Sequence, residues 1–326
     1  MAVLIGRQGY AGLAIESVAG TPESAPSVFL PMTEFGLLSK NEKIVDLSSR
    51  ASRFKDHDAI SGKKWSEGDL GMYLDVINSG YLFKLALGNE VKTAVQANPA
   101  VHNHQFFPTA SGNTAVTSTI WGYGNEGNQV ARYSRVAVDS LEIEIPNEGL
   151  ATMKASLMGE DGTFVSAPTL TTTSGTLFTW AVTNVRFGAT LTEALAATPT
   201  KVTNIKVNIN NNLQMIYRSG SATVSEIALG ENEILGDYTV LMEGITEMTA
   251  YKNATKQAVV ITLTGGSMGG VSEQLQILIP RVIAEDVEIE TGQADIFAIT
   301  TSFRALRGSA EGPFVVNLQN GKTTTY

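Results

Sequence analysis

The chain has 326 residues, of which 43% are hydrophobic, and a formal net charge of −9 at pH 7. Its length allows two domains of ordinary size, and its excess of acid disfavours a tight grip on nucleic acid. It contains no cysteine, which excludes disulfides, thiolate nucleophiles and cysteine-ligated metal sites. No apolar run approaches the roughly 20 residues of a membrane-spanning helix, and nothing resembles a secretory signal. We therefore expect a chain that folds in a cytoplasm and has no contact with membranes.

Alternation of apolar and polar residues over five to ten positions predicts β-strands through most of the chain. Clear examples, in chain order, are residues 67–75, 141–145, 150–158 and 201–210. Helical patterns are confined to two short stretches, residues 79–87 and 245–252. The sequence therefore predicts a mainly β, α+β chain with antiparallel pairing.

Several segments occur twice, in the same order. The motif R-V-x-x-D-S-L-E-I-E at residues 135–144 returns as R-V-x-x-E-D-V-E-I-E at residues 281–290, an offset of 146. Upstream, G-D-x5-D at residues 68–75 returns as G-D-x5-E at 236–243, and T-x-F-x-L at 33–37 returns as T-x-I-x-V at 203–207. The offsets of 170, 168 and 146 place an insertion of roughly twenty residues in the first copy, before Arg135.

The repeat predicts two tandem domains, each with one short flanking helix. We expect an N-terminal arm at 1–28, a first domain at 29–160, a linker at 161–177, a second domain at 178–307 and a C-terminal tail at 308–326. Within the first domain, residues 42–64 are predicted to form a long loop that is functional or ordered by a partner. This loop is rich in both charges: Arg50, Arg53, Lys55, Asp56, Asp58, Lys63 and Lys64.

Patterns typical of enzymes are weak in this sequence. The run Gly265–Gly269 matches a nucleophile elbow, but no helix pattern and no histidine follow it, so we expect a hairpin turn. The pair His102 and His104 has no third ligand at a recognisable spacing, and solvated loop histidines are the alternative to a metal site. The paired glutamates at 142 and 144 recur in the second copy, which favours a structural role over glycoside hydrolysis. We expect no catalysis, no cofactor and no metal.

The segments L-A-I-E-S-V-A-G-T-P at residues 13–22, F-L-P at 29–31 and the G-D strand resemble bacteriophage tail tube proteins. The second half is similar to the large, internally duplicated members, through F-T-W at 178–180, N-I-N-N-N-L at 208–213, I-T-L-T-G-G at 261–266 and I-P-R-V at 279–282. The resemblance covers nearly the whole chain.

This resemblance implies two tandem domains of the β-sandwich or barrel type, whose inner sheets join neighbouring subunits into a ring around a closed, β-lined channel. Single-domain members form hexamers, so a duplicated chain implies a trimer with pseudo-sixfold symmetry. The rings stack into a tail tube that conducts the genome during ejection, as part of the virion, after assembly in the host cytoplasm. A tape measure protein and a tail terminator are implied partners, and DNA passes without sticking.

On this reading, the polar side of the strands lines the channel. The residues expected to face the lumen are Glu67, Asp69, Asp75, Glu142, Glu144, Lys154, Asn204, Lys206, Asp237, Glu243, Glu288 and Glu290. Most of them are acidic and would repel the phosphates of DNA. The lysines allow a mixed rather than uniformly negative lining. The loop at 42–64 occupies the place of the family's docking loop, and we expect its charges to pair across the junction between rings.

Two alternatives stay open at this point. A related ring protein, such as a tail terminator or a component of a secretion tube, shares the fold but caps or carries instead of elongating. A carbohydrate-binding or hydrolytic β-sandwich could use Trp65, Trp121 and Trp180 as sugar platforms, although tryptophans are more often core or interface residues.

Overall fold

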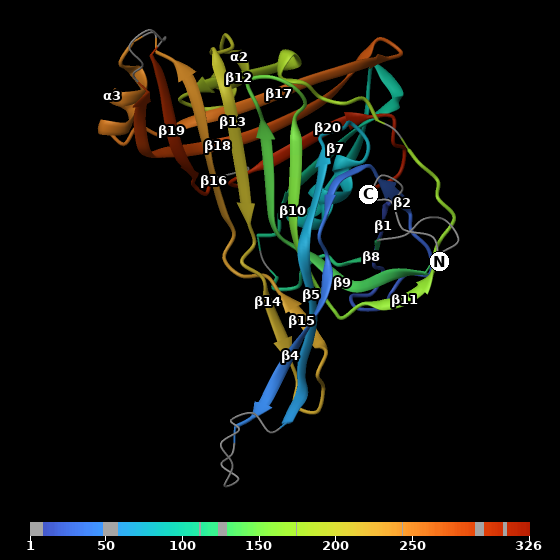
Figure 1. Ribbon diagram of the computed structural model, residues 1–326. Helices are drawn as coiled ribbons and strands as arrows, with labels where there is room; N and C mark the ends of the chain where they lie inside the picture. Colours follow the sequence, from blue (N-terminus) through green and yellow to red (C-terminus); the bar gives the residue numbers. More distant parts are fainter. Residues whose placement is uncertain are drawn as a thin grey trace.

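The computed structural model describes residues 9–47, 58–110, 112–122, 129–173, 175–242, 244–290, 297–308 and 312–326. Strands dominate it (Figure 1). Those of the first half are β1 Ala11–Ile15, β2 Val28–Leu30, β3 Met32–Phe35, β4 Leu38–Asp46, β5 Asp58–Tyr73, β6 Gly88–Val95, β7 Asn98–Pro108, β8 Ser118–Gly122, β9 Gln129–Ile145, β10 Thr152–Gly159 and β11 Thr163–Ser166. Those of the second half are β12 Thr183–Gly188, β13 Val202–Asn210, β14 Gln214–Tyr217, β15 Val224–Ala228, β16 Glu233–Leu241, β17 Gln257–Met268, β18 Val271–Glu290, β19 Ala298–Ala305 and β20 Val315–Asn320.

One long antiparallel layer runs through both halves of the chain. In the first half its strands pair in the order β3–β5–β10–β9, and β4 continues along β5. In the second half the order is β13–β16–β19–β18. The two series are joined directly, because the C-terminal part of β9 pairs with β13, with Glu144 opposite Lys206.

Further strands lie against the long layer. β9 and β18 each continue from the long layer into these strands. The first part of β9 pairs with β8 and β11, and β8 leads on to β1 and β2. The first part of β18 pairs with β17 and β20, which lead to β12 and to β7 and β6. The chain is mainly β, as expected, whereas the alternative of a barrel is wrong, since the sheets are not closed.

The main core fills the space between the long layer and these further strands, and it follows from the alternation in the strands. In β10, Met153, Ala155 and Leu157 are buried while the residues between them are partly exposed. Side chains from both halves form one continuous cluster, which includes Phe178 and Phe303. A single apolar core thus spans the region that the sequence predicted as two domains.

The two helices predicted from the sequence are present as α1, Ser79–Leu87, and α3, Thr246–Lys252. The left-handed backbone of Gly88 (φ 85°) ends α1. Every residue of α1 except Lys84 is buried, whereas α3 has no buried residue. The second half also has a helix that was not predicted, α2, Leu191–Ala196, and a short 3₁₀ turn at Trp180–Val182. None of the helices in the described residues is long and apolar enough to span a membrane.

The predicted loop at 42–64 is wrong at both of its ends. Residues 42–46 belong to β4 and residues 58–64 to β5, and the two strands form a hairpin that projects from the body of the molecule (Figure 1). Four of the charged residues assigned to the loop, Arg50, Arg53, Lys55 and Asp56, lie outside the described residues. The sheet of β14 and β15 packs beside the base of the hairpin, where Lys64 N donates to Ala222 O at 2.8 Å.

The predicted arms and linker also carry strands. β1 lies within residues 1–28 and pairs with β8, and β2 begins at Val28, the last residue of that range. β20 lies within 308–326, between β18 and β7, and β11 lies within 161–177.

Glu16 anchors the N-terminal segment. Its carboxylate accepts hydrogen bonds from Gly20 N (2.7 Å), Thr117 Oγ1 (2.7 Å), Thr119 Oγ1 (3.0 Å) and Arg135 N (2.8 Å). The sequence did not reveal these segments as part of the fold, because their strand partners lie about a hundred residues away along the chain.

Candidate functional site: the charged face of the long sheet

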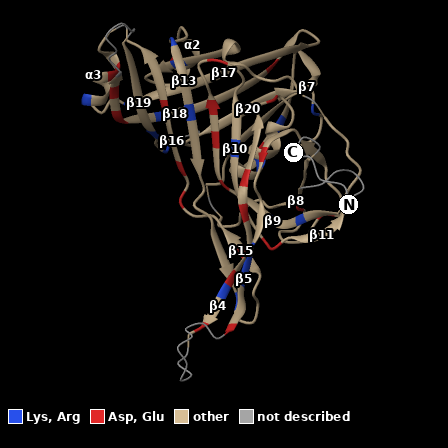
Figure 2. Cartoon of the chain, in the orientation of Figure 1, with Lys and Arg blue, Asp and Glu red and all other residues tan. Residues whose placement is uncertain are grey.

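One face of the long layer is polar over its whole width. The strand registers bring the predicted polar residues side by side: Glu67, Asp69, Lys154, Glu142, Glu144, Asn204, Lys206, Asp237 and Glu288. Lys206 of β13 lies opposite both Glu144 of β9 and Asp237 of β16. Figure 2 shows acidic and basic positions interspersed along these strands. The strand registers therefore bring these residues to one face of the sheet, and that this face lines a lumen stays a prediction.

On the first half of this face, Lys154 holds two carboxylates. Its ammonium lies 2.9 Å from Asp69 Oδ2 and 3.2 Å from Glu34 Oε2. Ser156 Oγ donates a hydrogen bond to Asp69 Oδ1 at 2.7 Å. This hydrogen bond, followed by the contact with Lys154, lowers the pKa of Asp69, and the same carboxylates raise the pKa of Lys154. Asp69 is therefore held in its ionised form.

At the seam between the halves, Lys206 also forms an ion pair with a carboxylate. Its ammonium lies 2.8 Å from Glu142 Oε2, and this contact raises the pKa of Lys206. Burial raises the pKa of the neighbouring Asp237, and the charge of Lys206 offsets part of this effect. One cation thus lies among three carboxylates, Glu142, Glu144 and Asp237.

A third basic centre was missed by the sequence reasoning. Arg304 of β19 donates through Nη1 to Glu233 Oε1 at 2.9 Å and through Nε to Glu285 Oε1 at 2.5 Å. The sequence carried a usable signal, since Arg304 follows Thr300 and Ser302 at two-residue spacing on the same side of β19. Two predicted members stay untested, because Glu243 and the side chain of Glu290 lie outside the described residues.

The face as a whole carries more acidic than basic residues, but its lysines lie next to carboxylates and offset part of their charge. Among the predicted residues placed on it, six carboxylates stand against the two lysines, 154 and 206. Lys154 contacts two carboxylates and Lys206 contacts one, so part of each positive charge is offset by its neighbours. Within the described residues no group of histidine, aspartate and glutamate is arranged to hold a metal ion. The arrangement presents a wide charged surface.

Asp75 does not lie on this face, contrary to the prediction. β5 ends at Tyr73, and Asp75 is buried in the turn before α1. Its Oδ1 accepts hydrogen bonds from Ile77 N (2.7 Å) and Asn78 N (2.5 Å). Burial raises its pKa, partly offset by these hydrogen bonds. The alternation that assigned Asp75 to the polar face stops where the strand stops, and Asp75 shapes the start of the helix instead.

The charged hairpin residues within the described part have contacts inside the chain. Lys63 Nζ lies 4.9 Å from the centre of the Tyr217 ring, and Lys63 N donates to Glu42 Oε2 at 3.1 Å. Asp58 Oδ1 accepts from Ala59 N at 2.8 Å. Exposed apolar residues accompany these charges, since Ile44 and Ile60 face each other across the hairpin with exposed fractions of 51% and 64%.

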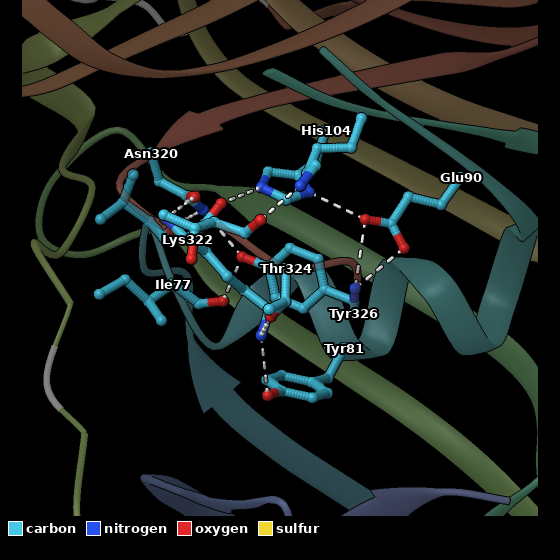
Figure 3. A network of polar contacts seen from close by, with 11 residues as sticks. Ile77, Tyr81, Glu90, His104, Asn320, Lys322, Thr324 and Tyr326 are labelled. Carbon is cyan, nitrogen blue, oxygen red and sulfur yellow. Dashed lines mark hydrogen bonds and ion pairs between the residues drawn. The ribbon is translucent and has the colours of Figure 1, made fainter. Parts of the chain in front are cut away.

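The other patterns weighed in the sequence have structural explanations. A hairpin turn is present, but it lies at the end of the predicted run: residues 265–268 belong to β17, and the turn is made by Gly269 and Gly270, both with positive φ. His104 is not a solvated loop residue, so that alternative is wrong. It is buried in β7, with Nδ1 2.8 Å from Glu90 Oε1 and Nε2 3.0 Å from Lys322 O (Figure 3).

The three tryptophans do not form a common platform. Trp121 is buried in a small cluster with Tyr10 and Phe29, and Trp65 packs at the base of the hairpin. Trp180 is about half exposed in the 3₁₀ turn. A sugar-binding row of aromatic rings is thus not built from these residues.

Comparison with known proteins gives one clear result. The model of the family described as phage tail tube protein matches residues 6–316, nearly the whole chain. No curated protein matches the sequence.

Proposed function

The chain belongs to the phage tail tube protein family, and on this premise we propose that it is the major subunit of a tail tube, in which three chains form each pseudo-hexameric ring. The rings stack into the conduit through which the genome leaves the virion. The subunit acts without catalysis. The observation that carries this proposal is the internal seam between β9 and β13, which joins two similar series of strands into one layer.

Three correspondences support an internal duplication. The strand order β3–β5–β10–β9 matches the order β13–β16–β19–β18. The ladder between β9 and β10 skips Asp139, and the ladder between β18 and β19 skips Glu285, which lies 146 residues later. These bulges fall at the offset that the sequence repeat defines.

The third correspondence is a pair of glycines. A Cβ on Gly68 would lie 2.1 Å from Gly36 O, and a Cβ on Gly236 would lie 2.5 Å from Lys206 O. The glycines are 168 residues apart and the carbonyls 170 residues apart, which are the offsets of the repeat at those places. Each half thus needs a glycine where its second strand approaches the first.

If the halves are equivalent, the seam between β9 and β13 is a template for the joint between subunits. β18 would then pair with β3 and β4 of the next chain, because these are the corresponding strands. The observed pairs of Glu142 with Asn208 and of Ser140 with Asn210 translate into Glu288 with Leu38 and Asp286 with Lys40. Among the described residues, β18 beyond Val282 pairs only with β19, and β3 and β4 pair only with β5.

The same joint, repeated three times, closes a ring of six similar units. Its polar face turns toward the axis, where the compensated acidic surface keeps DNA from adhering. Joining the edge strands also removes exposed β edges, which would otherwise promote uncontrolled aggregation. A tape measure protein and a tail terminator remain the expected partners of such a tube.

We extend the proposal to the hairpin of β4 and β5, which reaches an adjacent ring. The expected pairing of charges across this contact stays a prediction, and exposed Ile44 and Ile60 beside the charges support an apolar contribution as well. Apolar contact between rings is less sensitive to salt than ion pairing, so stacking should persist at high ionic strength.

Exchange of charges across the joint tests the proposal. Lys40→Asp places two acids opposite each other at each joint and should reduce ring formation, as seen by negative-stain electron microscopy. The double variant Lys40→Asp with Asp286→Lys restores opposite charges and should recover rings. The proposed joint is wrong if Lys40→Asp assembles as the parent does, or if the double variant is no better than the single one while both remain folded.

A further inference from the structure

The two halves differ by one hairpin, and the difference leaves the second helix uncovered. The offset of the repeat falls from 168 to 146 between α1 and the motif of β9, and the hairpin of β6 and β7 lies in this interval. This hairpin packs on α1. In the second half, α3 leads directly to β17, and no described hairpin takes the corresponding place.

At the seam within the chain, the hairpin fills the outer side of the joint. Val316 of β20 pairs with Phe106 of β7 and is fully buried. Phe106 in turn lies against Phe83 of α1, with 5.9 Å between ring centres. A packed series therefore runs from the helix of the first half, through β7, to the last strand of the second half.

The segment after β20 completes this cover (Figure 3). Tyr326 Oη donates to Ile77 O at 2.8 Å, and its ring packs edge-on against Tyr81 with centres 4.9 Å apart. Asn320 Nδ2 donates to Val76 O and to Tyr326 Oη. The start of α1 is thus sealed by the strand and tail that belong to the second half.

The corresponding positions at the outer ends of the chain are apolar and exposed. β11 pairs with β9 as β20 pairs with β18, so Phe164, opposite Ala131, corresponds to Val316, opposite Ile277. Val316 is fully buried, but Phe164 is 78% exposed. Ile245, just before α3, is 66% exposed, and Met248 and Tyr251 on α3 are 37% and 43% exposed. Tyr251 lies 168 residues after Phe83, so it takes the place of that ring in the repeat.

We infer that α3 of one subunit packs against β11 of the next subunit in the ring, with Phe164 lying on Met248 and Tyr251. The inference rests on the proposed ring. If the joint between subunits has the register of the β9–β13 seam, then α3 of one subunit faces β11 of the next as α1 faces β20 within the chain. Within the chain, Phe106 fills the space between Phe83 and Val316. At the joint between subunits, the equivalent space lies between Tyr251 and Phe164. The larger side chain at 164, compared with the valine at 316, fills part of this space.

Cysteine pairs test the contact in the full chain, which has no cysteine of its own. The test pair is Phe164→Cys with Tyr251→Cys, treated after assembly by oxidation and by a short bismaleimide linker. Formation of covalent dimers and trimers on a denaturing gel is expected. The control pair, Phe164→Cys with Ile216→Cys, should give none, although Ile216 is 41% exposed, much as Tyr251 is.

A second pair, Leu38→Cys with Glu288→Cys, reports on the inner joint and separates the two proposals. If this pair links and rings form, but residues 164 and 251 do not link, the outer contact is wrong and the ring stands. If neither pair links and no rings form, both proposals fall. A link between Val3→Cys and Phe164→Cys in place of the expected one would assign the space to the N-terminal segment and overturn the inference.

A substitution measures the strength of the contact without cross-linking. Phe164→Ala removes a ring that is mostly exposed in the single chain, so the fold should be unaffected. Its burial at the joint is worth on the order of a tenfold change in affinity per joint. Rings of the variant should therefore dissociate at higher protein concentration than those of the parent, and unchanged dissociation would contradict the contact.

Discussion

Ile289 gives the sharpest test of the proposed joint between subunits. Its side chain is 40% exposed, whereas its counterpart Ile143 is 1% exposed beside Val207 in the seam within the chain. The same register would bury Ile289 against Leu37 of the next subunit. Full burial of an isoleucine is worth roughly 2.5 kcal/mol, so burial of the exposed two-fifths contributes about 1 kcal/mol. Ile289→Ala should therefore cost about 1 kcal/mol at each joint.

The effect multiplies when a ring closes. Three joints together lose about 3 kcal/mol, which corresponds to a fall of roughly a hundredfold in the formation constant of the ring. Ile289→Asp should abolish rings, because a carboxylate buried without a partner costs several kcal/mol. Sedimentation velocity over a range of protein concentrations measures the ring fraction, and thermal unfolding of the single chain checks that the variants fold.

Leu195→Ala is a matched control, because Leu195 is 43% exposed but lies on α2, away from the proposed joint. It should leave the ring fraction unchanged. The reasoning would be refuted if Ile289→Ala and Ile289→Asp both formed rings at the concentrations at which the parent does.

Three further predictions concern the single chain. The contacts of Asp69 lower its pKa, so the ionised group stabilises the fold above its unfolded pKa of about 4. This stabilisation is lost as the pH falls through the lower folded pKa. In urea unfolding, Asp69→Asn should therefore lower the free energy of unfolding by roughly 0.5 kcal/mol at pH 7, allowing for partial exposure of the group, and by less at pH 2. Gly68→Ala should lower the free energy of unfolding by more than about 2 kcal/mol, since its Cβ would lie 2.1 Å from a backbone carbonyl oxygen. Gly149→Ala, also at positive φ but in open space, should lower it by only about 1 kcal/mol. Equal losses would contradict the close approach. Glu16→Gln should cost about 2 kcal/mol, because an amide cannot accept all four hydrogen bonds of the carboxylate, and it should speed hydrogen exchange at the Arg135 amide; unchanged exchange would argue against this anchor.

The parts of the fold that follow from local alternation could be predicted from the sequence. In β10, and in β13 from Asn204 onward, buried and half-exposed residues alternate strictly, so the strand and its polar face were both recognisable. The helices α1 and α3 could also be predicted, because their sequence patterns are local. β1 and β20 were not, because short strands at the ends of a chain are stabilised by partners far away in sequence, which no local pattern records.

The candidate site shows the same limit at the level of single residues. The alternation along β5 predicts that Glu67 and Asp69 share the polar face, as the strand register has it, and that they face a lumen stays a prediction. The alternation failed at Asp75, where the strand has ended and the carboxylate accepts hydrogen bonds from backbone amides instead. Arg304 lies on the polar side of β19, but its partners Glu233 and Glu285 come from the two neighbouring strands, β16 and β18, so no local pattern shows these ion pairs. Ion pairs depend on which strands become neighbours, and that information is tertiary.

The number of chains in a closed ring tests the central claim most directly, and native mass spectrometry of isolated rings measures it. We predict a mass of three chains of 34.7 kDa each, in rings whose end-on views contain six similar lobes. A ring of six chains, or chains that stay single at high concentration, would contradict the account.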